Sequence, residues 1–317
     1  MRSLKIGVIM DPIGKIDIDK DSTFVLMLEA QKRGHDLYYM ELDDLSIRGT
    51  TPEGNFRRVN VVRANPHHKF GTAASKPLSW FDVILMRKDP PFDMKFFFAT
   101  LLLSLVDERK CLVVNHPRGL REANEKLYSL NFPELIPPTL VSGNMEQLKQ
   151  FMKEQGGEMI IKPLDGCGGS GVFYLNQKDR NTNALLETAT DNGKRPIMAQ
   201  RYIPEVRKGD KRIIVVDGEP LGAILRVPRE DETRSNIHVG GRVVKADLTA
   251  RDREICRVMA PSLKKLGLYF VGLDVIGNYL TEVNLTSPTG IQEVNALDKV
   301  DLESRIIDFI EMKAPKK

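Results

Sequence analysis

The chain has 317 residues, of which 41% are hydrophobic and 28% are charged, and its formal net charge is +4 at pH 7. This composition is too apolar for a disordered chain, and the length suffices for two or three domains. Lys and Arg are spread along the sequence rather than clustered, which argues against nucleic acid as a partner. An odd number of widely separated cysteines argues against a disulfide framework or a zinc site: Cys111, Cys167 and Cys256.

No membrane segment is predicted. The longest apolar run, 96–106, is shorter than the roughly 20 residues that a spanning helix needs. The N-terminus leads directly into a predicted strand, without a cleavable signal. We therefore expect a cytoplasmic protein without a membrane partner.

The first part of the chain has the pattern of a β-α-β unit. An apolar run at 4–10 predicts a buried strand, and Asp21 or Ser22 can cap a helix that ends at Gly34. A second strand is predicted over 36–42. This order of elements favours a parallel sheet.

The next part completes a predicted Rossmann-like domain, residues 1–121. Residues 50–55 are rich in turn formers and are predicted to lie between two short extended runs. A strand over 81–86 ends in a charged loop, 87–93, at the edge where open α/β sheets bind ligands, although a Pro-rich turn with solvated charges has the same pattern. The apolar pattern then predicts a helix over 96–109 and a strand over 111–115.

Residues 122–203 are predicted to form a second domain. Helical spacing over 122–130 places Lys126 on a helix, where a lone Lys is usually solvated. An amphipathic helix over 144–155 and a strand over 197–203 are also predicted.

The most informative stretch of this region is 160–172, Ile-Ile-Lys-Pro-Leu-Asp-Gly-Cys-Gly-Gly-Ser-Gly-Val. Its glycines allow backbone N–H groups to point into one concavity, which favours phosphates, and Lys162 adds a point charge. The spacing also matches a dinucleotide-binding fingerprint, but that motif needs a helix after the loop. The β-favouring run 172–175 predicts a strand instead, so we interpret the stretch as a strand–loop–strand hairpin over phosphates. A glycine-rich surface turn is the alternative on the motif alone.

Residues 204–317 form the third predicted region. Strands are expected over 213–216 and 221–227, joined by a turn, and a helix is expected over 248–266. The polar loop 228–242 is long for a structureless loop, which favours a functional lid. It carries three arginines suited to carboxylates or phosphates, although a disordered polar insertion is the alternative: Arg229, Arg234 and Arg242.

A strand–turn–strand pattern near the C-terminus brings carboxylates together. Asp274 lies in the middle of the first strand, the turn lies at 277–278, and Glu282 and Asn284 share one face of the returning strand. A two-residue turn would pair Asp274 with Thr281 and put Glu282 on the other face, whereas a three-residue loop would pair Asp274 with Glu282. In the second register, two carboxylates and an amide would form an oxygen-only site suited to magnesium. An exposed sheet face is the alternative.

Together these features resemble prokaryotic glutathione synthetase, a family of ATP-grasp carboxylate–amine ligases, over essentially the whole chain. Ordered blocks carry the resemblance: Asp11-Pro12, 86–93, Asn124-Glu125-Lys126-Leu127, 162–169, 209–212, 215–220, 232–234, 240–242, 271–274 and 281–289. Two departures are Cys167, where the family usually has Met, and Gly290, where Cys is common. Residues 57–77 follow no recognised pattern.

The resemblance implies an α/β (α+β) fold in which a Rossmann-like, substrate-side N-terminal domain precedes a two-part ATP-grasp fold. The N-terminal domain would span 1–121. A central subdomain with the Gly-rich flap would span 122–203, and a C-terminal subdomain with the metal site and lid would span 204–317.

The resemblance also implies roles for individual residues. ATP would be bound by Lys126, Lys162, Gly166, Gly168, Gly169, Gln200, Ile203 and Asp210. Two Mg²⁺ (or Mn²⁺) ions, bound with ATP, would be held by Asp274, Glu282 and Asn284. Substrate would contact Arg226, Ser287 and Thr289. Two residues would be catalytic, one facing the developing charge and one shielding the acyl phosphate from water: Arg212 and Arg234.

The implied reaction joins γ-glutamylcysteine to glycine with ATP, through an acyl phosphate, to give glutathione, ADP and phosphate. The implied assembly is a homo-oligomer, a tetramer by resemblance. Two alternatives remain open at this point: another ATP-grasp carboxylate–amine ligase, and a non-catalytic ATP-binding module.

Overall fold

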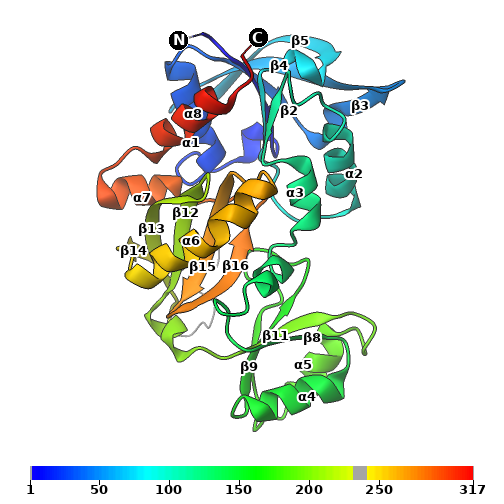
Figure 1. Cartoon of the computed structure of the whole chain (residues 1–317), viewed down its shortest axis with the longest axis vertical. Coiled ribbons are helices and arrows are strands. Elements are labelled where there is room, and N and C mark those ends of the chain that lie inside the picture. Colours follow the sequence, from blue (N-terminus) through cyan, green and yellow to red (C-terminus); the bar gives the residue numbers. More distant parts are fainter. Residues whose placement is uncertain (1, 231–240, 317) are drawn as a thin grey trace.

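The computed structural model describes residues 2–230 and 241–316. Three sheets follow one another along the long axis of the molecule (Figure 1). The N-terminal sheet lies at one end, a five-stranded sheet lies in the middle and a four-stranded sheet lies at the other end. This mixed α/β architecture confirms the predicted fold class.

The N-terminal sheet has a parallel centre, as predicted. Its order β2-β1-β6-β7 is formed by β1 Lys5–Ile9, β2 Asp36–Met40, β6 Val83–Met86 and β7 Leu112–Val114. Helices cover both faces, which explains why these strands are apolar apart from Lys5 and Asp36 at their first positions. One face packs on α1 Ser22–Lys32 and α8 Leu302–Lys313, and the other on α2 Met94–Leu103 and α3 Pro117–Glu122.

The prediction of a turn-rich segment at 50–55 between two short extended runs is wrong. An antiparallel extension of the sheet lies there, formed by β3 Leu45–Arg48, β4 Thr51–Val61 and β5 His68–Pro77. Pro52 and Gly54 alternate with exposed residues along β4, so these turn formers act as small buried residues. A Cβ at Gly54 would lie 2.8 Å from Leu78 Cδ2 and 2.9 Å from Met40 Sδ, which explains why no side chain fits. The end of β4 and the whole of β5 together account for most of the unrecognised segment 57–77.

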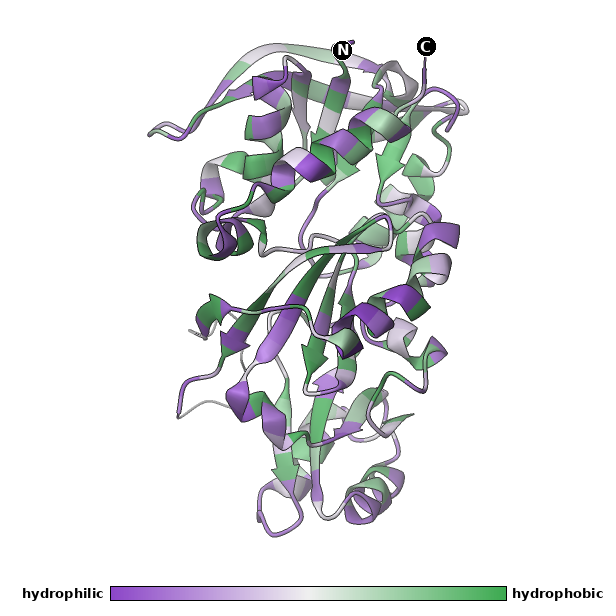
Figure 2. Cartoon of the chain, turned by 60° about the vertical axis from the view of Figure 1, so that its left-hand side comes forward, coloured by the Kyte–Doolittle hydropathy of each residue, from purple (hydrophilic) through white to green (hydrophobic). Residues whose placement is uncertain are grey.

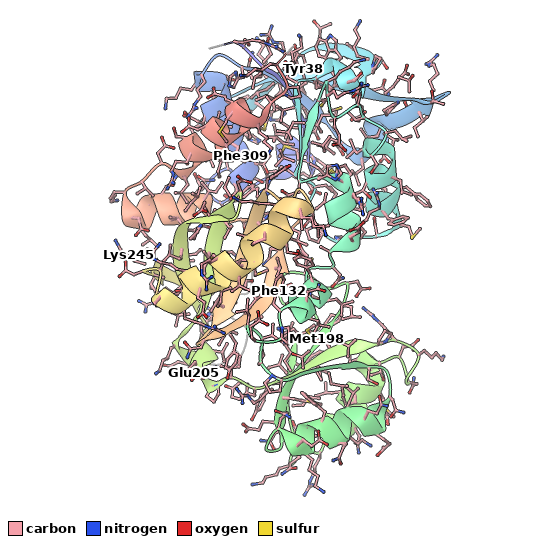
Figure 3. All side chains as sticks on the ribbon, in the orientation of Figure 1. Tyr38, Phe132, Met198, Glu205, Lys245 and Phe309 are labelled. Atoms are coloured by element: carbon pink, nitrogen blue, oxygen red, sulfur yellow. The ribbon has the colours of Figure 1, made fainter. Side chains whose placement is uncertain are left out.

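The four-stranded sheet has the order β10-β9-β11-β8 and is antiparallel. It consists of β8 Thr139–Ser142, β9 Glu158–Pro163, β10 Phe173–Asn176 and β11 Ile197–Arg201, with α4 Met145–Glu154 and α5 Thr182–Ala189 on one face. Ile197 and Ala199 point into this helical layer. The side chain of Met198, labelled in Figure 3, therefore belongs to the opposite face, which turns toward the rest of the molecule.

The five-stranded sheet has the order β14-β13-β12-β15-β16. Its strands are β12 Asp210–Val216, β13 Glu219–Val227, β14 Arg242–Lys245, β15 Phe270–Ile276 and β16 Tyr279–Asn284. One face packs on α6 Ala250–Lys265, and the other on α7 Ile291–Asp298 and α8. Short 3₁₀ turns complete the description: η1 Ile13–Lys15, η2 Leu42–Asp44, η3 Leu78–Trp80, η4 Leu127–Asn131 and η5 Pro204–Lys208.

The C-terminal helix α8 ties the five-stranded sheet to the N-terminal domain. Arg33, at the end of α1, donates hydrogen bonds to Ser304, Asp308 and Glu311 of α8. Two large apolar clusters contain residues of both sheets, whereas the core of the four-stranded sheet draws only on residues 140–199. The division into 1–121, 122–203 and 204–317 stays a prediction.

Apolar residues concentrate in the strands and on the inner sides of the helices, with polar residues outside (Figure 2). Within residues 2–230 and 241–316, no helix combines the length and the apolar character that a membrane span requires.

Candidate active site

A pocket lies between the four-stranded and the five-stranded sheets. It is lined from one side by β9, β11 and the glycine loop, and from the other by β12, β15 and β16. All eight residues predicted to bind ATP line it: Lys126, Lys162, Gly166, Gly168, Gly169, Gln200, Ile203 and Asp210. The structure therefore brings together residues that are spread over positions 126–210 of the chain.

The predicted helix over 122–130 is wrong. A local turn takes its place and brings Lys126 to this pocket. The Asn124 side chain accepts hydrogen bonds from the N–H groups of Lys126 and Leu127, both at 3.0 Å, and this local turn replaces helical bonding. The Lys126 side chain is 4% exposed, and its Nζ donates to Gly166 O at 2.5 Å and to Glu282 Oε1 at 3.1 Å. A lysine that helical spacing alone would leave in solvent thus joins the glycine loop to the β16 carboxylate.

Lys162 enters from the last residues of β9. Its Nζ donates to Gln200 Oε1 at 2.8 Å and to Thr281 O at 3.5 Å. Burial lowers the pKa of Lys162, and the nearby Glu282 carboxylate partly offsets this effect. Among residues 2–230 and 241–316, no carboxylate contacts the Lys162 amine directly, so a bound phosphate would supply its counter-charge.

The glycine loop joins β9 to β10, so a strand follows it, as predicted, and the dinucleotide fold is excluded. Gly168, Gly169 and Gly171 have φ of 61°, 81° and 69°, conformations that favour glycine. At Gly166 the constraint is space, since a Cβ there would lie 2.5 Å from Pro163 Cγ. Because these positions have no side chains, the loop backbone can approach a ligand more closely than the backbone of a loop with larger residues could.

The β15–β16 hairpin contains features of both registers that the sequence left open. The turn has two residues, so that Ile276 pairs with Tyr279, yet Asp274 pairs with Glu282. A bulge makes both possible: the register shifts by one residue between Asp274 and Val275, and Thr281 is the extra residue. The Thr281 hydroxyl donates to Asp274 O at 3.1 Å. The bulge thus puts the two carboxylates on one face.

Asp274 is the centre of a buried ionic network. Its carboxylate accepts two bonds from Arg212, at Nε and Nη2, and lies 2.9 Å from Arg226 Nη2, which also bonds Asp210. Burial alone would raise the pKa of Asp274, but Arg212 and Arg226 hold it well below its usual range. Likewise, burial would lower the pKa of Arg226, but Asp210 and Asp274 raise it. The network therefore keeps both Asp274 and Arg226 ionised.

Gly272 makes room for this network. It lies two residues before Asp274 on β15, on the same face. A Cβ at Gly272 would lie 2.9 Å from Arg212 Cδ and 3.2 Å from Arg212 Nε. The guanidinium can reach Asp274 only because this position has no side chain.

A second pocket adjoins the first, and Cys167, Gly168 and Glu282 line both. The three residues predicted to bind substrate line this second pocket, together with catalytic and metal candidates: Arg226, Ser287, Thr289, Arg212 and Asn284. Arg226 Nε has no hydrogen-bond partner in the described part of the chain. The other catalytic candidate, Arg234, lies outside the described residues.

Three charged residues of the second pocket had been given no role from the sequence. Lys20 precedes α1, Glu293 lies in the first turn of α7, and Glu125 lies beside Lys126. Glu125 Oε1 accepts from Leu285 N at 2.8 Å and from Thr286 N at 3.1 Å, so it positions the segment after β16. Burial raises the pKa of Glu125, and the Glu282 charge adds to this shift.

A role for Glu125 in the site could have been suspected from the sequence, because it lies between Asn124 and Lys126 in a block that carried the resemblance. No local sequence pattern indicates that Lys20 or Glu293 belongs to the site. Burial also raises the pKa of Glu293, and its Oε2 has no partner among the described residues. Lys20 and Arg212 line the same pocket as this carboxyl. The second pocket therefore contains both acidic and basic side chains.

The residues present fit a cation of the magnesium type. Asp274 and Glu282 face each other, and Asn284 Nδ2 donates to Asp274 Oδ2 at 3.1 Å, which fixes the amide beside both carboxylates. Within the described residues, no three His, Cys, Asp or Glu side chains gather as a self-sufficient metal site. Two carboxylates and an amide suit a cation that takes its remaining ligands from phosphates and water.

Comparison with known proteins agrees with this geometry. Residues 4–121 match the family described as "Prokaryotic glutathione synthetase, N-terminal domain", and residues 125–299 match "Prokaryotic glutathione synthetase, ATP-grasp domain". Curated proteins named glutathione synthetase from Shewanella oneidensis and Escherichia coli O157:H7 are each 46% identical. The first aligns over 310 residues, 97% of this chain and 98% of the relative, and the second over 311 residues, 97% and 98%.

Solved structures show the same fold at lower identity. D-cycloserine synthetase DcsG is similar with a TM-score of 0.69 and 16% identity, covering 98% of this chain and 99% of that one. The ATP-grasp ligase PsnB, solved with a precursor peptide and AMPPNP, is similar with a TM-score of 0.64, 16% identity and 100% coverage of both chains. With both of its parts matched along nearly its whole length, the chain belongs to the prokaryotic glutathione synthetase family of ATP-grasp ligases.

Proposed function

We propose that the two adjoining pockets carry out the family's reaction, with ATP in the first and γ-glutamylcysteine and glycine in the second. Glutathione synthetase activity follows from family membership and from 46% identity to curated glutathione synthetases. One observation supports the assignment to these pockets: residues predicted for ATP and for substrate separate into two pockets that share a wall at Cys167, Gly168 and Glu282. The γ-phosphate would meet the attacking carboxylate at that wall.

In the proposed first step, the cysteinyl carboxylate of γ-glutamylcysteine attacks the γ-phosphorus of ATP, and ADP leaves. Lys126 and Lys162 hold the phosphates, and the glycine loop covers them with backbone N–H groups. Arg212 donates to the oxygens on which charge develops. Catalysis then rests on positioning and charge neutralisation, since the transfer needs no enzyme nucleophile.

In the second step, the amine of glycine attacks the acyl phosphate, and inorganic phosphate leaves. Arg226, Ser287 and Thr289 would orient the substrates, and Arg234 would help to exclude water. Glycine must lose a proton as it attacks, and the released phosphate can accept it. This assignment leaves no step that requires a titrating side chain of the chain itself.

ATP-grasp ligases typically use Mg²⁺ with ATP, and we propose that Asp274, Glu282 and Asn284 hold two such ions, with Mn²⁺ as a substitute. When bound, the ions would neutralise charge on the β- and γ-phosphates. The cytoplasmic location and the homo-oligomer, a tetramer by resemblance, are likewise proposals.

A single-turnover assay with γ-glutamylcysteine, glycine and Mg-ATP tests the proposal. Glu282→Gln and Lys162→Ala should each lower ligation about 10²–10³-fold, the order of loss seen when one charge-stabilising group is removed. Lys178→Ala, at an exposed position, is the matched control and should ligate normally. Near-normal turnover in either site variant would refute the assignment. A panel of other amino-acid pairs, followed by phosphate release, separates this reaction from those of other ATP-grasp ligases.

A further inference from the structure

Glu282 differs from Asp274 in how firmly its basic partner is held. Asp274 accepts bonds from two nitrogens of Arg212 and lies 2.9 Å from Arg226, and both arginines are buried. Glu282 is 22% exposed, and Lys126 Nζ donates one bond to its Oε1 at 3.1 Å. The Asp274 pairs are therefore bidentate and shielded from water, whereas the Glu282 pair is a single bond near solvent and exchanges more readily.

Lys126 combines a fixed backbone with a movable ammonium. Its N–H donates to Asn124 Oδ1 at 3.0 Å, and its carbonyl oxygen accepts from Ser129 Oγ at 2.7 Å. The ammonium lies at the end of a flexible four-carbon stem with rotatable donors. Lys126 can therefore change partners while the turn that carries it stays in place.

The bond from Lys126 to Glu282 competes with a metal ion for the same carboxylate. An ammonium 3.1 Å from Oε1 and a magnesium ion about 2.1 Å from that oxygen would repel each other. Each carboxylate that lines the first pocket has a basic partner: Lys126 for Glu282, Arg212 and Arg226 for Asp274, and Arg226 for Asp210. A divalent cation that arrives alone must therefore displace a basic side chain of the protein.

Phosphate groups offer the Lys126 ammonium a stronger partner than one carboxylate, because a triphosphate carries several negative charges and several acceptor oxygens. We propose that Lys126 is an internal counter-ion of Glu282 that nucleotide phosphates draw away. Glu282 then becomes available for a metal ion only when a nucleotide is present. Lys126 thereby makes the site specific for the metal–nucleotide complex and excludes the free metal. This inference rests on the proposed binding of nucleotide phosphates in the first pocket.

The same movement of Lys126 frees the glycine loop. Lys126 Nζ also donates to Gly166 O at 2.5 Å, so one ammonium joins the loop to the β16 carboxylate. When phosphates take this ammonium, the loop loses a bond that ties it to β16, and its N–H groups can approach the phosphates. One side chain therefore couples the arrival of phosphate to changes at both Glu282 and the loop.

Lys162 provides a comparison within the same pocket. Its Nζ donates to uncharged oxygens, Gln200 Oε1 at 2.8 Å and Thr281 O at 3.5 Å. Movement of Lys162 toward a phosphate would therefore release no carboxylate. Both lysines carry one positive charge, so replacing each by Met separates the loss of charge from the loss of the contact with Glu282.

The first test measures Mn²⁺ binding to the full chain without nucleotide, by electron paramagnetic resonance of the unbound ion. The unaltered chain should bind Mn²⁺ weakly, and Lys126→Met should bind it about tenfold more tightly, a typical magnitude for coupling between two sites. Lys162→Met is the matched control and should raise the affinity much less. An unchanged affinity in Lys126→Met, or an equal rise in both variants, would overturn the proposal.

The second test measures hydrogen exchange of the loop amides over 166–171 without nucleotide. Exchange should be several-fold faster in Lys126→Met than in the unaltered chain, because the bond to Gly166 O is lost. Lys162→Met should exchange like the unaltered chain. Equal exchange in all three proteins would overturn the coupling of Lys126 to the loop.

Mn²⁺ binding in the presence of the nucleotide analogue AMPPNP separates this inference from the proposed function. The unaltered chain should then bind Mn²⁺ tightly, and Glu282→Gln should lose most of that affinity. Tight binding that persists in Glu282→Gln would refute the metal assignment in the proposed function, and this inference with it. Loss of binding in Glu282→Gln, combined with an unchanged nucleotide-free affinity in Lys126→Met, would refute only the exchange by Lys126.

Discussion

The two hairpins that face each other across the first pocket are built in opposite ways. The β9–β10 hairpin has a long glycine loop that offers backbone groups and one exposed thiol, Cys167. The β15–β16 hairpin has a two-residue turn and offers two carboxylates, Asp274 held by buried arginines and Glu282 held by Lys126. The difference indicates that the loop depends on positions without side chains, whereas the β15–β16 hairpin depends on the identity of its charged side chains. A substitution at Cys167, a non-glycine position of the loop, should therefore be far less costly than a substitution at Asp274.

The largest expected effect follows from Asp274→Asn on β15. The change leaves Arg212 and Arg226 buried with one negative charge fewer, and breaking such a pair costs about 3–5 kcal/mol of unfolding free energy. Ligation should also become undetectable. Urea denaturation measures the stability, with Glu187→Gln at an exposed helical position as control. A stability within about 1 kcal/mol of the unaltered chain would contradict the account of the network, given the magnitude that such pairs show.

A smaller effect is expected from Gly272→Ala. The new Cβ must displace the Arg212 side chain, which costs about 1–3 kcal/mol as an overpacked site. The rate of ligation should fall more than ATP affinity, because Lys126 and Lys162 are untouched. Gly14→Ala is the control, since its Cβ would meet only ordinary contact, with His68 Cε1 at 3.7 Å. Equal losses in rate and ATP affinity would argue against a specific effect on Arg212.

The next effect depends on pH and concerns Lys162. Because burial lowers its pKa from 10.5, there is an alkaline window in which the free site holds a neutral amine. Bound phosphates favour the ammonium form, so ATP binding should take up a proton in that window and none at lower pH. Titration calorimetry in two buffers of different ionisation enthalpy measures the uptake. Lys162→Arg stays charged and should abolish it, while uptake that persists in this variant would assign the proton elsewhere.

The smallest effect is expected at Cys167 in the glycine loop. Although the residue is exposed overall, partial desolvation of its sulfur at the pocket wall raises the pKa of this thiol, and the Glu125 charge adds to the shift. Alkylation at neutral pH should therefore be slower than for a free thiol. Once attached, N-ethylmaleimide should raise the KM for ATP several-fold, and bound ATP should protect the thiol. Cys167→Ala should bind ATP normally and resist the reagent. An unchanged KM for ATP after complete labelling would contradict the placement of Cys167 in the pocket wall.

The fold and the membership of the site were largely predictable from the sequence, because they rest on local patterns. Strand–loop–strand order around the glycines, the Asp21 cap on α1 and the parallel β1 and β2 follow from periodicity and turn chemistry. The roles proposed for the site residues rest on the resemblance, and the variants above test them.

The rest depended on contacts between residues distant in the chain. The bulge at Thr281 could not be predicted from the turn residues, because the same residues are compatible with a two-residue turn and with a three-residue loop. The helix predicted around Lys126 failed because the Asn124 side chain competes for backbone N–H groups. β4 was missed because Pro52 and Gly54 normally indicate turns, and only the packing of Gly54 under Leu78 and Met40 explains them.

The attachment of α8 to α1 has a consequence for how the active site opens and closes. Arg33 and the two shared cores make the N-terminal and five-stranded sheets one body, so Lys20, Asp89 and Arg212 keep fixed positions around the second pocket. The four-stranded sheet has a core of its own, so a domain motion would move it as a separate unit. We therefore expect a hinge at the edges of that small lobe to govern entry to the first pocket, while the walls of the second pocket on the other two sheets stay rigid.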